Sequence, residues 1–485
     1  MVADTLPPSP PPAGERGPLS GVRVIDITTI FMGPSATQML GDLGADVIKI
    51  ESPEDDVIRS IGPQGQRKMG PLFLAMNRNK RSIVLDLKTP DGLAALIDLV
   101  RGADVLTYNV RPQAMARLGL DYDTLAAVNP RLIYAGMFGF SQRGRYAASA
   151  AFDDLIQAAC ALPQAMAMAS GDIPRYLPIT IADRSVGLYA FGVIAAALYG
   201  RERSGRGQRV DIPMFETMVP QVLGDHLYGQ TFVPAQGDFG YPRLLSPQRR
   251  PYATRDGHVC CLIYTDVQWR AFLKAIGQAS LFDTDSRFGD IRARTQHIDA
   301  LYAMVSDQIG RRSTTELQAL LAGTDIPVFP MHTFDTLLQD AHLDDIGFFS
   351  TQEHPDVGTI RQMAVPSEWS GTPPGAATPA PRLGQHSRAV LREAPGRSGD
   401  AGRTPQCALA ATARHRADAV RKWLCAGGRV HQPQSHLARC GTGSLAGHTP
   451  AHLHGTLEDH RPGRDVRSDQ AGGSSGGRRW RRVRQ

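Results

Sequence analysis

The segment "PITIADRSVGLYAFGVIAAAL", residues 178–198, holds one acidic side chain, Asp183, between an extended apolar stretch and a run of small apolar residues. From Val186 onward apolar residues recur every three or four positions, which predicts a helix. Its opposite side is also small or apolar, so we expect burial on all sides. An aspartate at the start of a helix can accept hydrogen bonds from free backbone N–H groups, and these donors also favour the ionised carboxylate that a nucleophile requires. The residues alone leave two roles open for Asp183, a plain N-cap and a catalytic carboxylate.

The elements that must position this carboxylate alternate regularly between residues 21 and 141. Apolar runs such as "GVRVIDIT" and "DVIKIE" are typical of buried strands, and "TPDGLAALIDLVRGA" is typical of an amphipathic helix. Strands separated by helices predict a doubly wound, Rossmann-like α/β domain, in which ligands bind at the carboxyl ends of the strands. The chain has no GxGxxG after its first strand and no P-loop motif, so neither nucleotide-binding fingerprint is present.

Changes in composition divide the chain. We predict a large domain formed by residues 18–225 with 336–395, and a smaller α+β domain over residues 226–335, where aromatic residues and turns are more frequent. Residues 1–17 are rich in proline and are expected to be a disordered leader. Residues 396–485 lose all periodicity, which fits either a disordered basic tail or the product of a reading-frame shift late in the gene.

The remaining composition narrows the class of protein. The chain is 42% hydrophobic and 21% charged, as soluble globular proteins are, and no signal peptide or membrane anchor is predicted, so a cytoplasmic location is expected. The six cysteines are too scattered for a disulfide framework or a zinc site, so no metal is expected. Residues 396–485 contain sixteen basic and six acidic residues. Because the net charge of the whole chain is +6, the rest of the chain is slightly acidic. Nucleic-acid binding by the folded part therefore has no electrostatic support.

Several blocks across residues 18–394 carry a resemblance to a known family. They are "GPSATQMLGDLGADVIKIE", "NRNKRSIVLDLKTPDG", "ADVLTYNVRPQAMARLGLDYDTLAAVNPRLIYAGMFGF", "IADRSVGLYAFGVIAAALYGRERSGRGQRVDIPMFE" and "PRLGQHSRAVLRE". Together they resemble the family III CoA-transferases, which include formyl-CoA transferase and the carnitine CoA-transferase. The resemblance implies an enzyme that moves CoA from an acyl-CoA to a free carboxylic acid, with the CoA thioester as a substrate and no permanently bound cofactor. It also implies an interlocked homodimer.

In that family the nucleophile is an aspartate that precedes a helix of small residues, which matches Asp183 in "IAD". The implied reaction passes through an aspartyl anhydride and an aspartyl-CoA thioester. Asp153, in "AAFDDLIQAAC", matches an acidic position near the nucleophile of formyl-CoA transferase. Two roles are open for it, one as a residue that orients the nucleophile or binds CoA and one as the N-cap of its own helix.

The resemblance also implies contacts to CoA at the ends of two strands. Two departures from the family affect this part: Ser52 stands where an arginine is frequent, and Phe31 stands where formyl-CoA transferase has a glutamine. Some phosphate contacts are therefore expected to be rearranged, and Lys88 and the arginines also fit solvated surface positions. The implied contacts are Leu85, Asp86, Leu87, Lys88, Asn109, Val110, Arg111 and Arg117.

The same fold hosts α-methylacyl-CoA racemases, which we keep as the alternative function. Their aspartate falls at Asp183 too, but their catalytic histidine aligns with Phe152. Phenylalanine cannot exchange a proton, so the sequence favours the transferase.

Overall fold

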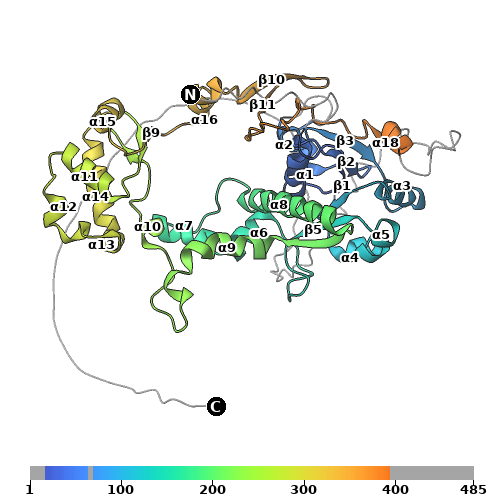
Figure 1. The fold of residues 1–485 in the computed structure, drawn as a ribbon, viewed down its shortest axis with the longest axis horizontal. Helices are drawn as coiled ribbons and strands as arrows, with labels where there is room; N and C mark the ends of the chain where they lie inside the picture. The colour runs from blue at the N-terminus through green and yellow to red at the C-terminus, as the bar shows by residue number, and fades with distance from the viewer. Residues whose placement is uncertain (1–16, 64–68, 394–485) are drawn as a thin grey trace, which may run out of the picture. The chain divides into compact units, whose positions relative to one another are not determined.

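The computed structural model describes residues 17–63 and 69–393. Six strands form one parallel sheet in the order β3-β2-β1-β4-β5-β6 (Figure 1). This order reverses between β1 and β4, as in dinucleotide-binding sheets, in which ligands bind at the carboxyl ends of the strands on either side of the reversal. The mixed α/β class expected from the sequence is confirmed. The strands are β1 (Arg23–Ile27), β2 (Asp46–Glu51), β3 (Lys80–Val84), β4 (Val105–Tyr108), β5 (Ile133–Phe138) and β6 (Gln208–Pro213).

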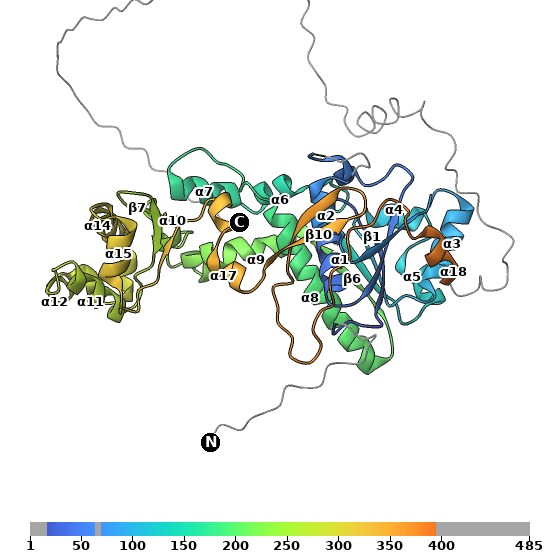
Figure 2. The same cartoon turned by 90° about the horizontal axis from the view of Figure 1, so that it is seen from above.

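Helices cover both faces of this sheet (Figures 1 and 2). Side chains alternate along each strand, so β1 sends Val24 to one face and Ile25 to the other. On the face of Val24 lie α1 (Met32–Asp42) and α8 (Ile181–Ser204). The opposite face is covered by α3 (Pro90–Val100), α5 (Tyr122–Val128) and α18 (Ser387–Glu393).

The helices α1 and α8 approach each other closely at Gly187. A Cβ atom added there would lie 2.3 Å from Ser35 Oγ and 2.8 Å from the backbone oxygen of Met32. Only glycine allows α8 this approach, so the first turns of the two helices are held side by side. Both are the first turns of helices that run against the parallel strands, and they therefore lie at the carboxyl edge of the sheet.

The prediction that α8 is buried on all sides is wrong. One stripe is buried, but on the other side Leu188, Tyr189 and Tyr199 expose 60%, 54% and 67% of their surface. The periodicity was read correctly, but a helix that covers one face of a sheet buries only one side. By length and composition, α8 is also the one helix of the described ranges that could span a membrane, a property that core helices of soluble proteins share.

A second hydrophobic core lies within residues 252–326, packed around Trp269, Phe272 and Phe288. It joins a three-stranded antiparallel sheet, in the order β7-β8-β9, to a group of short helices. These elements are β7 (Tyr252–Ala253), β8 (His258–Cys261), β9 (Val328–Pro330), α11 (Asp266–Ala275), α12 (Leu281–Thr284), α13 (Ile291–Gln296), α14 (Ile298–Gly310) and α15 (Thr314–Leu321).

Late in the described chain, residues 378–387 lie along β3. The backbone N–H of Asn79 donates to the oxygen of Thr378, and the N–H of His386 donates to the oxygen of Ser82. The division into domains stays a prediction, and the leader up to residue 16 and the tail from residue 396 fall outside the described residues. The other elements are α2 (Pro71–Met76), α4 (Pro112–Arg117), α6 (Asp153–Ala159), α7 (Leu162–Ser170), α9 (Met214–His226), α10 (Pro242–Leu245), α16 (Phe334–Leu337), α17 (Ala341–Asp345), β10 (Phe349–His354), β11 (Gly358–Met363) and the 3-10 turns Val57–Ser60, Tyr228–Thr231 and Ser286–Phe288.

Candidate active site

Asp183 lies in the first turn of α8, whose N-cap is Thr180. Its side chain is half-buried, and within the described residues no hydrogen bond reaches its carboxylate. The expectation that Asp183 caps its own helix is therefore wrong. Its backbone is the hydrogen-bonded part, because the N–H of Asp183 donates to Asp153 Oδ1 at 3.0 Å.

Asp153 supplies the missing cap from another helix. It is buried at the first position of α6, where Phe152 is the N-cap, so the reading of Asp153 as the N-cap of its own helix is wrong. Its second oxygen, Oδ2, accepts from Gln157 Nε2 at 2.6 Å, and Gln157 Oε1 accepts from the N–H of Leu177 at 3.0 Å. The carboxylate of Asp153 thus joins α6, the segment before α8 and the Asp183 turn into one hydrogen-bonded unit.

Gln157 is a residue of the site that the sequence reasoning missed. It stands four positions after Asp153 on the same helix, which is the spacing at which an amide and a carboxylate can pair. That spacing is the signal that could have identified it.

The environment of Asp183 works against its ionised form. Burial, followed by the neighbouring charge of Asp153, raises the pKa of Asp183 to about 7, while Arg184 acts in the opposite direction. We expected an ionised carboxylate held by cap donors, and this expectation is wrong because no residue in the described ranges donates to the carboxylate and a second carboxylate is near. The pKa of Asp183 in the folded protein lies above its ordinary value of 3.8, so the folded state favours the protonated carboxyl. The contribution of this group to the free energy of unfolding is therefore highest below that ordinary value and falls as the pH rises through about 7.

This arrangement predicts a pH effect on the reaction. If the ionised form of Asp183 attacks, kcat/KM rises with pH and reaches half of its plateau near pH 7. Replacing Asp153 by asparagine removes the second charge and keeps the side-chain shape, so the midpoint falls by about 1 pH unit. It does not return to the ordinary aspartate value, because burial is the larger cause.

The measurement is the pH profile of kcat/KM for wild type, Asp153→Asn and the control Asp154→Asn. Asp154 is the exposed neighbour of Asp153 on α6, so its replacement leaves the midpoint in place. An identical midpoint in wild type and Asp153→Asn would show that the carboxylate pair does not set the titration.

The expected CoA contacts lie at the carboxyl ends of two separate strands. Asn109 follows β4 and pairs with the chain after β1, since its Oδ1 accepts from the N–H of Thr29 at 3.1 Å and its Nδ2 donates to the oxygen of Thr29 at 2.8 Å. This pair joins the two loops at the reversal of strand order. Val110, Arg111 and Arg117 follow on the exposed surface of the same segment.

The other four expected contacts follow β3, which β2 and β1 separate from β4. Leu85 is buried, and its N–H donates to the oxygen of Glu51, so its side chain belongs to the core. Asp86 Oδ1 accepts from the N–H of Lys88 at 3.0 Å, which shapes a turn that exposes the lysine. The backbone of Leu87 lies in this turn. Ser52, where the family often has arginine, is exposed just beyond β2, between these two groups.

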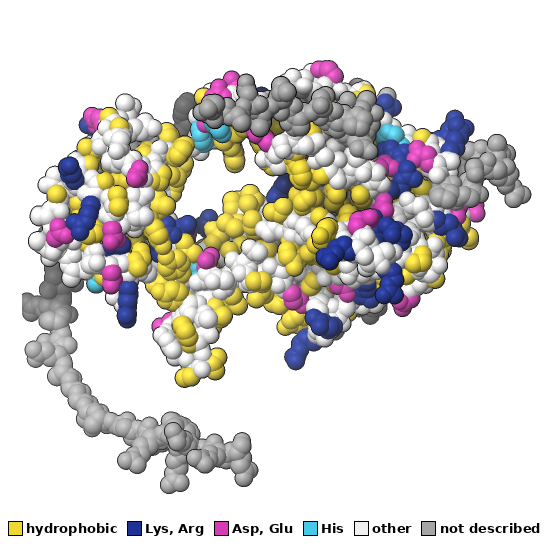
Figure 3. Space-filling view, viewed as in Figure 1, with side chains coloured by type: hydrophobic (Ala, Val, Ile, Leu, Met, Phe, Trp, Pro, Cys, Tyr) yellow, Lys and Arg dark blue, Asp and Glu magenta, His cyan; other side chains and the backbone are white. Residues whose placement is uncertain are grey.

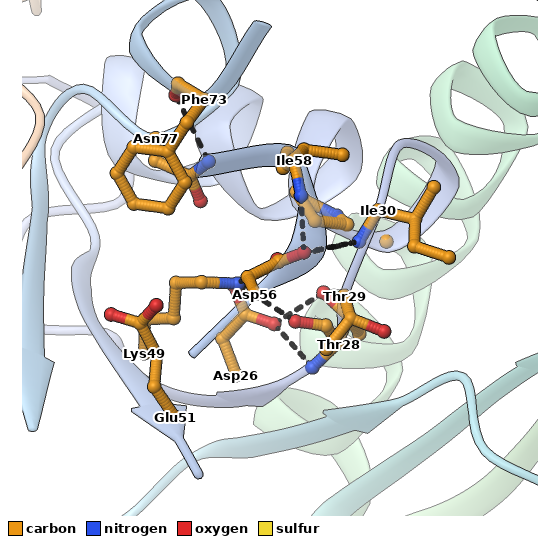
Figure 4. Close-up of polar contacts among 12 residues, drawn as sticks. Asp26, Thr28, Thr29, Ile30, Lys49, Glu51, Asp56, Ile58, Phe73 and Asn77 are labelled. Atoms are coloured by element: carbon orange, nitrogen blue, oxygen red, sulfur yellow. Dashed lines mark hydrogen bonds and ion pairs between the residues drawn. The ribbon is translucent and has the colours of Figure 1, made fainter. Parts of the chain in front are cut away.

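The sequence reasoning also missed a set of buried charges near β1, β2 and β3. Asp26 and Lys49 are fully buried, and Lys80 and Asp56 are nearly so. The available signal was a charged residue inside each apolar strand, in "RVIDI", "DVIKIE" and "KRSIV". Lys80 Nζ donates to Asp26 Oδ2 at 3.2 Å. Lys49 Nζ donates to Asp56 Oδ2 at 3.2 Å, and both of these residues are labelled in Figure 4.

The geometry defines an α/β protein with two adjacent carboxylates at the carboxyl edge of a parallel sheet whose strand order reverses between β1 and β4. A profile of the family described as CoA-transferase family III matches residues 19–387. The chain belongs to this family, and it is an enzyme of the CoA-transferase class.

Individual relatives agree with this assignment. The chain is 32% identical over 389 residues to the succinate–glutarate CoA-transferase of Agrobacterium fabrum. The aligned region covers 78% of this chain and 96% of the relative. It is 34% identical over 329 residues to the acetyl-CoA:oxalate CoA-transferase of Acetobacter aceti, and this alignment covers 66% of this chain and 82% of the relative. A solved CAIB/BAIF family protein from Brucella suis matches with a TM-score of 0.65 at 29% identity, covering 78% of this chain and all of the other.

Proposed function

We propose that this enzyme transfers CoA between an acyl-CoA and a free carboxylic acid, with Asp183 as the nucleophile. The observation that carries the proposal is the position of Asp183. It lies in the first turn of α8, half-buried, hydrogen-bonded through its backbone to Asp153 and without a partner for its carboxylate among the described residues. A carboxylate with no hydrogen bonds to break, in a partly dehydrated site, is a strong nucleophile once it is ionised.

The proposed reaction has four steps. The Asp183 carboxylate attacks the thioester carbonyl of the donor, the C–S bond breaks, and an aspartyl anhydride forms with release of the CoA thiolate. The thiolate then attacks the aspartyl carbonyl, which releases the donor acid and leaves an aspartyl-CoA thioester. The acceptor carboxylate attacks that thioester and expels the thiolate. Finally the thiolate attacks the acceptor carbonyl of the second anhydride, which forms the new acyl-CoA and restores Asp183.

We propose short dicarboxylic acids as the substrate class. The relatives named above are described as acting on succinate, glutarate and oxalate, and each of these carries a second carboxylate beyond the one that reacts. Succinyl-CoA and acetyl-CoA, tested as donors against a panel of mono- and dicarboxylic acids, separate this class from monocarboxylic substrates.

Trapping of the intermediate tests the function itself. Incubation of the enzyme with acyl-CoA and hydroxylamine should convert an activated aspartate to its hydroxamate, and we expect mass spectrometry to find this change at Asp183. A hydroxamate at another carboxylate would relocate the nucleophile, and transfer without any modified residue would contradict a covalent route.

The candidate CoA contacts give a separate prediction. Arg111 is exposed beside Asn109, and its guanidinium is suited to a phosphate group. We expect Arg111→Ala to raise KM for the acyl-CoA by about 10-fold, the loss of one charge-assisted hydrogen bond, while kcat changes little. Arg101→Ala, an exposed arginine at the end of α3, is the control. Equal KM values for both variants would remove Arg111 from the CoA site.

Racemase activity is the second candidate function, and the presence of Phe152 argues against this activity. This residue is the N-cap of α6 and is 58% exposed, so a side chain that cannot carry a proton stands directly before Asp153. Exchange of deuterium at the α-carbon of an acyl-CoA in D₂O, with no acceptor acid present, would support the racemase.

We also propose that the chain forms the interlocked homodimer implied by its family, and that it works in the cytoplasm. Apolar side chains gather on the surface over α7, α8 and α9 (Figure 3). On α8 itself, Leu188, Tyr189 and Tyr199 are exposed. Exposed apolar patches of this kind mark surfaces that another chain covers. Light scattering during gel filtration tests the proposal, and a monomer at the concentrations of the assay would contradict it.

A further inference from the structure

The loop between β1 and α1, formed by Thr28, Thr29, Ile30 and Phe31, is held by side chains from outside it. The N–H of Thr28 donates to Asp26 Oδ1 at 2.9 Å, and the N–H of Thr29 donates to Asn109. We call these four residues the 28–31 loop. Its backbone conformation is therefore set by the side chains that surround it.

Asp56 holds the third residue of this loop. The N–H of Ile30 lies 3.3 Å from each oxygen of the Asp56 carboxylate (Figure 4). Asp56 also accepts from the N–H of Ile58 at 3.3 Å and from Lys49 Nζ at 3.2 Å, and Lys49 Nζ donates to the oxygen of Thr28 at 2.8 Å. Asp56 and Lys49 are almost completely buried, so this ion pair is fixed in place and little screened by solvent.

Ile30 adopts a backbone conformation that it would not choose alone. Its φ is +70°, in the left-handed region, which is a genuine outlier for a β-branched residue. Such a conformation costs free energy and persists only where surrounding contacts impose it. The contacts available to impose it are the hydrogen bonding of the Ile30 N–H to Asp56 and the packing of the Ile30 side chain against the cluster that contains Ile58 and Phe73.

The 28–31 loop connects the two halves of the candidate active site. Thr29, on one side of Ile30, is paired with Asn109, a candidate contact for CoA. On the other side, α1 begins at Met32, whose backbone oxygen faces Gly187 one turn along α8 from Asp183. The backbone conformation of Ile30 therefore sets the direction of the chain between Thr29, which is paired with Asn109, and α1. The helix α1 in turn packs against the first turns of α8, which carry Asp183.

We propose that Asp56, held by Lys49, is a positioning residue for CoA transfer, because it imposes the conformation of Ile30 that aligns the nucleophile turn with the CoA contact at Asn109. The inference rests on the proposed function. Asp56 acts through Ile30 and is not assigned a contact with CoA or with Asp183. The structure therefore assigns it an effect on the rate of the chemical step and little effect on the binding of substrate.

The central experiment compares Asp56→Asn with the double variant Asp56→Asn/Ile30→Gly. Asparagine loses the charge that orders the site, and a misplacement of about 1 Å costs up to about 100-fold, so kcat is expected to fall between about 10- and 100-fold with KM for acyl-CoA almost unchanged. Glycine adopts a positive φ without strain. The double variant therefore regains kcat to within about threefold of wild type, although its melting temperature stays as low as that of Asp56→Asn because Lys49 is still unpaired.

A matched control separates this role from general stability. Asp42 is also a buried carboxylate, paired with Arg78 at 2.7 Å, but it lies at the far end of α1. Asp42→Asn is expected to lower the melting temperature and to leave kcat unchanged. If Asp56→Asn does not fold, Asp56→Asn/Lys49→Met, in which no unpaired charge remains, takes its place with and without Ile30→Gly.

Two results would overturn the proposal. Wild-type kcat in Asp56→Asn would show that the ion pair serves stability alone, and failure of Ile30→Gly to restore kcat would show that Asp56 does not act through Ile30. Hydrogen exchange of the peptide that contains the 28–31 loop gives a readout without activity, and at least 10-fold faster exchange is expected in Asp56→Asn. If wild type transfers no CoA for any donor and acceptor, the proposed function fails, and the exchange result still decides whether Asp56 holds the loop.

Discussion

Replacing Asp183 by asparagine should reduce CoA transfer by at least about 10³-fold, because the amide cannot form the anhydride through which both half-reactions of the proposed mechanism pass. The side chain accepts no hydrogen bond within the described residues, and its backbone N–H stays bonded to Asp153 in the variant. The fold and the affinity for CoA should therefore change little. Initial rates with the best donor and acceptor, together with CoA binding by calorimetry, measure both quantities.

Asp183→Ala is the second variant in this experiment, because slow deamidation of asparagine can restore traces of aspartate. It should show no recovery of activity on storage. Asp154→Asn, which changes an exposed carboxylate of α6, should keep full activity. Transfer at the wild-type rate by Asp183→Ala would remove Asp183 from the reaction and leave Asp153 as the next carboxylate to examine.

The second large effect is expected from Gly187, where α8 touches α1. A valine at this position places Cβ within 3 Å of both Ser35 Oγ and the backbone oxygen of Met32, and the backbone atom cannot move away without shifting α1. Overpacking of this kind costs about 1–3 kcal/mol of unfolding free energy, and we expect the upper end of that range. Denaturation by urea measures it.

Activity should fall further than stability does in Gly187→Val, because the displaced turn is the one that begins with Asp183. Gly200→Ala is the control on the same helix, where the nearest atom to an added Cβ is 4.0 Å away. Alanine favours a helix over glycine by about 1 kcal/mol, so Gly200→Ala should be as stable as wild type or slightly more so. Equal stability of Gly187→Val and wild type would show that α1 and α8 can separate without cost.

The fold class was predictable because apolar residues form short continuous runs in buried strands and recur every three or four positions in amphipathic helices. Strand order was not, since it depends on which strands pair in space; the reversal that places Asn109 beside Thr29 comes from the structure. Asp183 could be singled out as a candidate nucleophile by its type and its position at the start of a helix, and its role stays a prediction. The partner of its backbone lies thirty residues earlier, on α6, and local spacing does not reveal that contact.

Two expectations were wrong for a common reason. A cap at Asp183 is what its own helix predicts, but burial and the charge of Asp153 come from other segments and raise the pKa of Asp183 to about 7. Burial of α8 on all sides is likewise what its own side chains predict. Both properties depend on what other segments place nearby, which a reading of one segment does not include.

The hydrogen bonds of the 28–31 loop have a consequence for engineering. They hold Thr29 through its backbone alone, while its side chain is exposed and makes no hydrogen bond in the described part of the chain. A position whose backbone is fixed by its neighbours and whose side chain is free can accept many residue types without loss of geometry. Thr29 is therefore a suitable first position to randomise in a library that seeks new acyl groups, because its side chain can vary while the backbone that pairs with Asn109 stays fixed.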